Sequence, residues 1–182
     1  MRNCCGQFLA ANCIPLLVQQ RLNRYYSFNR SWEEFKVGFN DSRGNYWLGN
    51  DLLHQVTREA RYKLRCLIQG TTARTSVLVA YYDTFLVGSE SSNYTLRVAH
   101  YSGNAGDNLN NHNGMMFTTY DRDNDLNAEN NCAQLNGGGF WYKNCYTGYG
   151  GGMAGVTVNR GQGTGFGWGT TALQRVTMLL TC

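Results

Sequence analysis

The chain has 182 residues and a mass of 20.5 kDa, which suits one domain with its own hydrophobic core. Its net charge is only +4 and its arginines are scattered, so the sequence does not indicate a nucleic-acid-binding protein. No apolar run is long enough to span a bilayer. Because charged residues make up only 15%, amides, hydroxyls and glycine must form most of the polar surface. The aromatic residues, 13% of the chain, would suit the binding of neutral ligands such as sugars as well as core packing.

The N-terminal twenty residues are a weak match to a signal peptide. One arginine precedes their apolar stretch, which is interrupted by Asn12, Cys13 and Pro15. We therefore expect either that a targeting sequence lies upstream or that the chain is a truncated product. Three N-glycosylation sequons favour an extracellular location, and they lie at Asn29-Arg30-Ser31, Asn40-Asp41-Ser42 and Asn93-Tyr94-Thr95.

Two short helices are expected in the first third of the chain. Ser31 and Glu34 have the spacing of a capping box, which predicts a helix running toward Val37. A second helix is expected after Asn50, with Leu52, Leu53 and Val56 on one face.

Strand patterns follow. Polar and apolar residues alternate in "RYKLRCLIQ" (61–69) and in "YTLRVAHY" (94–101), whereas "TSVLVAYY" (75–82) is a continuous apolar run of the kind found in buried strands. Long polar, glycine-rich stretches occupy about 102–170 before "LQRVTMLL" (173–180) predicts a final strand. We expect a single α+β domain over 1–182, with a central antiparallel sheet, short helices and a loop-rich binding region.

An acidic stretch lies within the loop-rich region. "DRDNDLNAENNC" (121–132) places four of the twelve acids of the chain in nine positions. Such a stretch forms either a solvated surface loop or a site for a hard cation such as Ca²⁺, which prefers several oxygen ligands. An EF-hand loop is not indicated, because its sixth position would be Leu126 and its twelfth Cys132.

Other chemistries find little support. The three histidines are isolated in sequence, and none of the seven cysteines has a C-x-x-C partner. We find no nucleophile elbow, zinc-protease motif, P-loop or dinucleotide fingerprint, so we expect no enzymatic activity.

Several motifs together resemble the fibrinogen C-terminal domain family. They are, in order, "NRSWEEFKVGF", "GNYWLGNDLLHQVT", "YSGNAGDNLNNHNGMMFTTYDRDND", "NCAQ" and "FWYKNCY". The resemblance runs from about Val18 to Trp168 and implies an extracellular binding module. The chain departs from the family at its N-terminal end, where most of a preceding subdomain is absent, and Cys4, Cys5, Cys13, Cys66 and Cys182 have no family counterpart.

The resemblance implies a use for the acidic stretch. In this family the corresponding loop binds one Ca²⁺, so Asp123 and Asp125 would supply carboxylates and Asn127 and Glu129 backbone carbonyls. It also implies a disulfide between Cys132 and Cys145 beside that site.

In the lectin members of the family, a cis peptide bond places neighbouring N–H groups against an acetylated sugar. The resemblance implies that the corresponding bond here is Asn144–Cys145. Three positions of the lectin pocket differ in this chain. Asn136 and Gln162 stand where a tyrosine is expected, and Tyr146 stands where a histidine is expected. The ligand-binding residues implied are Asn136, Asn144, Cys145, Tyr146 and Gln162.

These features lead to two hypotheses for function. The first is a secreted, calcium-dependent lectin-like domain that binds acetylated or related glycans, or glycoproteins, on microbial or host surfaces in innate immune recognition. Such lectins depend on avidity, so we expect homo-oligomers. The alternative is an extracellular protein–protein interaction module without sugar specificity, or a truncated paralogue that binds nothing.

Overall fold

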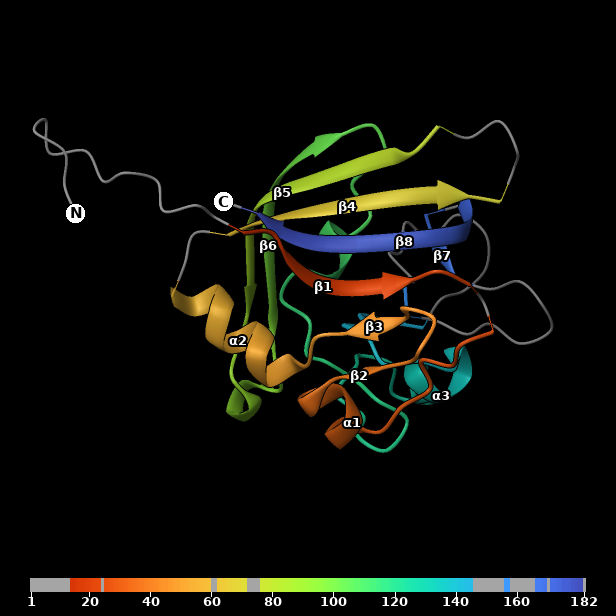
Figure 1. Cartoon of the computed structure of the whole chain (residues 1–182). Helices are drawn as coiled ribbons and strands as arrows, with labels where there is room; N and C mark the ends of the chain where they lie inside the picture. Colours follow the sequence, from red (N-terminus) through yellow and green to blue (C-terminus); the bar gives the residue numbers. More distant parts are fainter. Residues whose placement is uncertain are drawn as a thin grey trace, which may run out of the picture.

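An antiparallel β-sheet forms the framework of the protein in a computed structural model that describes residues 14–23, 25–59, 62–71, 76–145, 156–157, 166–169 and 171–181 (Figure 1). The strand order is β2-β3-β1-β8-β4-β5-β6, and β7 pairs with β8. The strands are β1 (Leu16–Arg21), β2 (Phe39–Asn40), β3 (Tyr46–Trp47), β4 (Lys63–Gly70), β5 (Leu78–Val87), β6 (Leu96–Gly103), β7 (Gly167–Trp168) and β8 (Thr171–Thr181).

The final strand, β8, lies in the middle of the sheet between β1 and β4. Its buried residues face those of β4 in register, so that Leu180 is opposite Leu64 and Met178 is opposite Cys66. Alternating burial along β4 confirms the alternation predicted from the sequence. In β5 the burial also alternates instead of covering both faces, since Ala80 and Tyr82 are buried whereas Tyr81 between them is half-buried.

The predicted capping box is present at the start of α1 (Trp32–Val37). The hydroxyl of Ser31 accepts a hydrogen bond from the N–H of Glu34, whose carboxylate accepts one from the N–H of Ser31. The second helix, α2 (Asn50–Glu59), also forms, but its buried face differs from our expectation. Leu52 is 42% exposed, whereas Asn50, Leu53 and Thr57 are buried and Val56 packs partly buried against the core.

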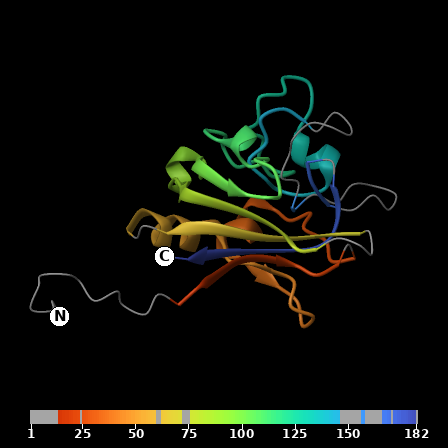
Figure 2. The ribbon, with the colours of Figure 1, turned by 90° about the horizontal axis from the view of Figure 1, so that it is seen from above.

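One long segment with little regular structure, residues 104–145, lies on one side of the sheet (Figure 2). We call it the loop region. It contains only the 3₁₀ turn η2 (Asn110–His112) and the short helix α3 (Cys132–Asn136), and a similar turn, η1 (Glu90–Ser92), precedes β6. None of the described helices is long and apolar enough to cross a membrane.

Aromatic packing joins the loop region to the rest of the core. The ring of Phe117 lies 5.0 Å from that of Trp141 and 5.0 Å from that of Phe35 in α1, and Trp141 lies 6.2 Å from Trp47 in β3. All four side chains are at most 1% exposed. Burial of rings of this size supplies much of the stabilisation available to a segment that has few backbone ladders of its own.

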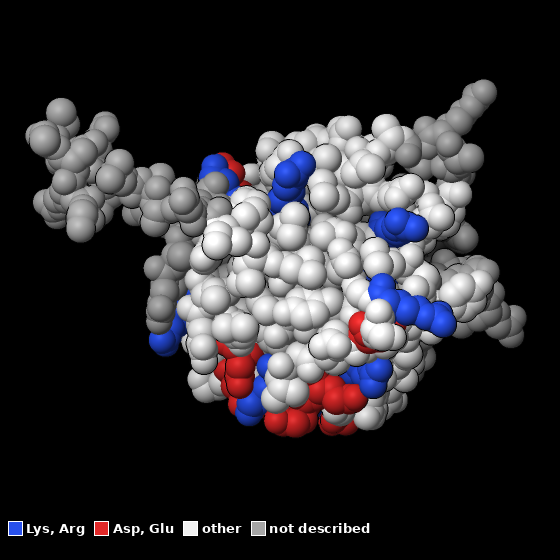
Figure 3. Space-filling model, in the orientation of Figure 1, with Lys and Arg blue, Asp and Glu red and all other residues white. Residues whose placement is uncertain are grey.

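Charged side chains are sparse over the face of the sheet and gather toward one edge of the molecule (Figure 3). This distribution agrees with the low charged fraction of the sequence. Buried charge is rare but present. The guanidinium of Arg21 lies over the rings of Phe28 and Phe166, and burial lowers its pKa to about 9.

His112 is buried in the loop region and should make the protein sensitive to acid. Its Nδ1 donates to the carbonyl of Trp141 at 2.8 Å, and burial lowers its pKa from 6.5 to about 4. Between pH 6.5 and about 4, His112 therefore binds a proton in the unfolded chain but not in the folded chain. We expect the free energy of unfolding to fall as pH drops from 6.5 toward 4, by up to about 1.4 kcal/mol per pH unit from this group.

The measurement is urea unfolding at several pH values in this range. His112→Gln keeps a donor for the Trp141 carbonyl, and it should flatten the dependence. His100→Asn, at an exposed histidine with positive φ, should leave it unchanged. An unaltered slope in His112→Gln would contradict this assignment.

Candidate functional site

The acidic stretch forms a loop whose backbone is held by its own side chains. We call residues 121–131 the acidic loop. The carboxylate of Asp123 accepts the N–H of Asp125 at 3.2 Å, and that of Asp125 accepts the N–H of Asn127 at 2.8 Å. The amide oxygen of Asn127 then accepts the N–H groups of Glu129 and Asn130. This succession of Asx turns explains why Asp and Asn occupy alternate positions.

Further contacts fix the acidic loop to its surroundings. The amide of Asn124 donates to the carbonyl of Phe117 at 2.8 Å, and the N–H of Leu126 donates to the carbonyl of Lys143 at 2.9 Å. The second carboxylate oxygen of Asp125 accepts the N–H of Cys132 at 2.9 Å. The loop is thus tied both to the aromatic core and to the segment that follows Trp141.

The predicted disulfide between Cys132 and Cys145 is present. It joins the first residue of α3 to the segment beyond Trp141, with the two Cα atoms 4.7 Å apart. Asp125 and the two cysteine sulfurs lie within 4.8 Å of one another, which is a possible metal-binding group by distance alone. Because both sulfurs are bonded to each other, they are not available as thiolate ligands, and only the carboxylate remains.

The electrostatics of the loop suit a cation. Burial raises the pKa of Asp125, and the negative charge of Asp123 raises it further, although the N–H groups of Cys132 and Asn127 favour the charged form. A raised pKa means that ionised Asp125 destabilises the fold once the pH has risen through that pKa. A bound cation would offset this cost.

The remaining predicted ligands also fit calcium. In the described part of the chain, the backbone carbonyls of Asn127 and Glu129 accept no hydrogen bond. Oxygens of this kind, together with carboxylates, are the ligands that Ca²⁺ prefers. Asp123, Asp125, Asn127 and Glu129 are the residues that would hold a Ca²⁺ ion, and this assignment stays a prediction.

The first acid of the loop has a structural role that the sequence did not reveal. Asp121 accepts the N–H of Trp32 at 2.9 Å and the hydroxyl of Thr119 at 2.7 Å, so it caps the first turn of α1 from a distance of 89 residues. The contact with Trp32 gives Asp121 a role different from the one predicted for Asp123 and Asp125.

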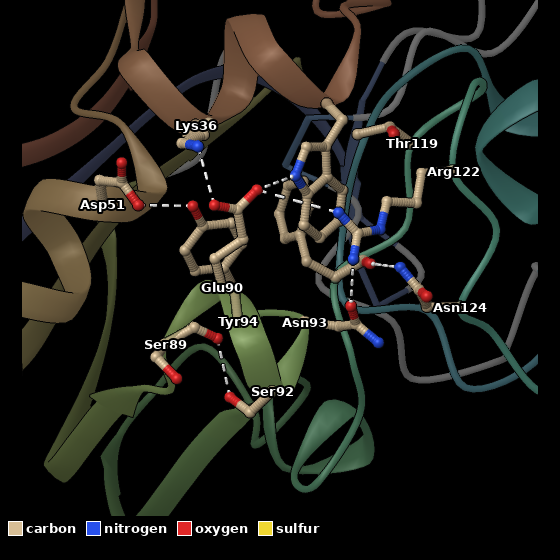
Figure 4. A network of polar contacts seen from close by, with 12 residues as sticks. Lys36, Asp51, Ser89, Glu90, Ser92, Asn93, Tyr94, Thr119, Arg122 and Asn124 are labelled. Carbon is tan, nitrogen blue, oxygen red and sulfur yellow. Dashed lines mark hydrogen bonds and ion pairs between the residues drawn. The ribbon is translucent and has the colours of Figure 1, made fainter.

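A polar network next to the loop also escaped the sequence reasoning (Figure 4). Arg122 stacks on the Trp32 ring at 3.9 Å and donates to the side-chain oxygen of Asn93 at 2.7 Å. Glu90 accepts from the Trp32 indole and pairs with Lys36 at 2.8 Å, and these two donors hold its pKa below the usual range. The network joins α1, η1 and the acidic loop.

The predicted ligand-binding residues fall into three groups. Asn136 is 4% exposed in α3 and its amide donates to the carbonyl of Cys132, so its polar end is occupied within the protein. Asn144 is exposed, and its side-chain oxygen accepts from the Asn127 amide and from the N–H of Cys145. Tyr146 and Gln162 lie outside the described residues.

The prediction of a cis peptide bond at Asn144–Cys145 is wrong. No cis bond occurs among the described residues, and this bond is trans. The trans form is preferred before a non-proline residue by about 3 kcal/mol, and here the Asn144 side chain binds the Cys145 N–H in that form.

Exposed apolar side chains occur on and beside the acidic loop. Leu126 within the loop is 59% exposed, Leu135 on α3 is 60% exposed, and Tyr120 just before the loop is 40% exposed. The Gln134 amide donates to the carbonyl of Tyr120 at 2.8 Å, which brings α3 next to the start of the loop. In the sequence, the indication of this exposed apolar group is Leu126, a leucine within the otherwise polar stretch 121–132.

Comparisons with known proteins place this geometry in context. Residues 10–180 match the family described as "Fibrinogen beta and gamma chains, C-terminal globular domain". Chicken Tenascin-R is 42% identical over 132 residues, which are 72% of this chain and 9% of that protein. Mouse Angiopoietin-related protein 2 is 40% identical over 129 residues, which are 71% of this chain and 26% of that protein. The chain therefore spans a small part of the length of these relatives.

Solved structures agree with the sequence comparison. The fibrinogen-like globe domain of human ANGPTL2 superposes with a TM-score of 0.76 at 31% identity, covering 91% of this chain and 79% of that one. A lamprey fibrin D-dimer complexed with the peptide Gly-His-Arg-Pro-amide superposes with a TM-score of 0.77 at 26% identity, covering 91% of this chain and 60% of that one.

The disulfide should contribute substantially to stability. Because it closes a loop of 13 residues, we expect Cys132→Ala/Cys145→Ala to lower the free energy of unfolding by about 3 kcal/mol, measured by urea denaturation. Cys66→Ala, which removes a buried thiol and leaves the disulfide in place, is the control and should lose clearly less. A double variant as stable as the parent would show that the bridge is dispensable.

Proposed function

Because the chain belongs to the fibrinogen C-terminal domain family, we propose that it is an extracellular, non-enzymatic recognition domain that binds a protein partner beside a calcium site. The support is the setting of the acidic loop. Exposed apolar side chains at Tyr120, Leu126 and Leu135 accompany carboxylates that are already braced by backbone hydrogen bonds. Protein interfaces combine apolar anchors with a polar rim in this way.

The relatives support a protein partner more than a sugar. A fold neighbour holds a peptide in its solved complex, and the sequence relatives are a tenascin and an angiopoietin-related protein. The lectin alternative would need exposed polar groups in the pocket implied by the lectin members. In the described part of that pocket, Asn136 is turned inward, and the side-chain oxygen of the exposed Asn144 already accepts from Asn127 and from the N–H of Cys145. Homo-oligomerisation stays a prediction from the sequence.

In this proposal calcium acts as a brace for the binding surface. The carboxylates of Asp123 and Asp125 and the carbonyls of Asn127 and Glu129 would hold the ion, whose positive charge would offset the repulsion between the two acids. The residues of the chain then do the recognition. The Asx turns hold the loop in shape, the disulfide fixes its far end, and Leu126 and Leu135 are presented to the partner.

The metal site can be tested by Asp123→Asn/Asp125→Asn. We expect calcium to raise the melting temperature of the parent, because a ligand at about a hundred times its Kd stabilises the folded state by about 2.7 kcal/mol. The double variant should show neither this rise nor heat of calcium binding by calorimetry. Asp83→Asn, at an exposed acid on β5 that pairs with Lys63, is the control and should respond as the parent does. Equal calcium responses in the double variant and in the parent would remove Asp123 and Asp125 from the site.

The partner class can be tested by binding of the calcium-loaded chain to intact animal cells. For a protein partner, we expect mild protease treatment of the cells to abolish binding, while free N-acetylglucosamine leaves it unchanged. Leu126→Ser/Leu135→Ser should weaken binding, and Val37→Ser, at a residue of α1 that is 66% exposed, should not. Release by the free sugar, with binding that survives protease, would instead establish the lectin alternative.

A further inference from the structure

We propose that the chain carries N-linked glycans at two open sequons, Asn29 and Asn40, and that the third, Asn93, stays unmodified in folded molecules. This inference rests on the proposed extracellular location but not on calcium or on the partner. The transfer joins the side-chain amide nitrogen to the anomeric carbon of an oligosaccharide. The bond from that carbon to a lipid diphosphate breaks, the diphosphate leaves with the electron pair, and the amide loses a proton. A modified asparagine must therefore direct its nitrogen into solvent in the folded protein.

Asn40 meets this requirement. It is exposed, it ends β2 at the edge of the sheet, and its side-chain amide makes no hydrogen bond within the described residues. The hairpin formed by β2 and β3 projects away from the body of the molecule (Figure 2). A glycan at this position would also cover an edge strand, which proteins commonly protect against pairing with other chains.

The rest of this sequon leaves room for a sugar. The middle residue, Asp41, is turned into the hairpin, where its carboxylate accepts the N–H groups of Arg43 and Asn45. Ser42 is exposed and borders a hollow of about 140 Å³ that is also lined by Tyr25, which is 79% exposed. The flat face of an exposed aromatic ring is a suitable surface for a sugar.

Asn29 is open in the same way and lies close by. It is exposed, and its side-chain amide makes no hydrogen bond in the part of the chain that the structure covers. The next residue, Arg30, stacks over the ring of Phe39, which directly precedes Asn40. The two open sequons thus belong to adjoining segments.

Asn93 is closed. Its side-chain nitrogen points to the sulfur of Met116 at 3.2 Å. Its side-chain oxygen accepts from Arg122 at 2.7 Å (Figure 4). Its backbone has a left-handed conformation with φ of 52°, and the next residue, Tyr94, is fully buried. A glycan on this nitrogen would have to displace Met116, so a chain modified here before folding could not reach this structure.

The three sequons therefore separate by geometry, not by motif. Asn93-Tyr94-Thr95 satisfies the sequence rule as fully as the other two. The open hairpin and the acidic loop lie on opposite sides in the view of Figure 2, so a glycan at Asn40 would leave the proposed binding surface accessible.

The test is expression of the full chain behind a secretion signal in mammalian cells, followed by peptide mass spectrometry. Site occupancy is measured on the protease-resistant, folded fraction, taken from the medium or from microsomes. We expect glycans on Asn29 and Asn40 and none on Asn93. Asn29→Gln/Asn40→Gln should abolish the mobility shift that an N-glycosidase produces, whereas Asn93→Gln should leave it as in the parent.

A second variant guards against loss of folding in Asn93→Gln. Thr95→Val destroys the sequon but keeps the contacts of Asn93, and it too should leave the shift unchanged. Folded protein glycosylated at Asn93, or folded protein bare at either Asn29 or Asn40, would overturn the proposal. Neither outcome bears on the calcium measurements, which can be made on unglycosylated protein.

Discussion

The placement of Trp141 is the constraint on which the loop region depends. Its ring packs against Phe117 and Trp47, its indole N–H donates to the carbonyl of Tyr94 at 2.7 Å, and its own carbonyl accepts from His112. One residue thereby connects the start of β6, the turn η2 and the segment that ends at Cys145. Because residues 104–145 contain few backbone ladders, their stability must come from such buried anchors and from side chains that bind backbone groups. The position of the acidic loop follows from this anchoring.

The acidic loop combines rigidity with unfavourable charge. Hydrogen bonds from N–H groups to Asp123, Asp125 and Asn127 define its backbone, yet the two carboxylates repel each other and one is partly buried. A loop built only for stability would contain asparagine at both acidic positions, because its side-chain oxygen accepts the same N–H groups without the charge. Two neighbouring carboxylates at these positions are therefore in keeping with the proposed cation site. That argument concerns the chemistry of the site and is independent of the partner that the surface recognises.

Local patterns were sufficient for much of the fold. The capping box of Ser31 and Glu34, the alternation in β4 and the bridge from Cys132 to Cys145 are local or motif-based signals, and the structure contains each of them. The errors arose where distant contacts decide the outcome. Leu52 was expected on the buried face of α2, and Asn144–Cys145 was expected to be cis. The cap that Asp121 provides for α1 and the central position of β8 depend on residues far apart in the chain, so no window of sequence could reveal them. The calcium ligands stay a prediction.

The same distinction applies to surface chemistry. Asn93 and Asn40 both satisfy the sequon rule, but the side chain of Asn93 is part of a network of Arg122, Trp32 and Glu90, whereas Asn40 ends an edge strand. The local motif determines which reaction is chemically possible at each asparagine. The packing around the side chain determines whether its nitrogen is accessible for that reaction. The acidic loop obeys this rule too, since Asp121 is occupied by α1 while the carbonyls of Asn127 and Glu129 accept no hydrogen bond within the described residues. In the proposed function, the polar groups available for recognition are therefore those that have no internal partner in the described part of the chain.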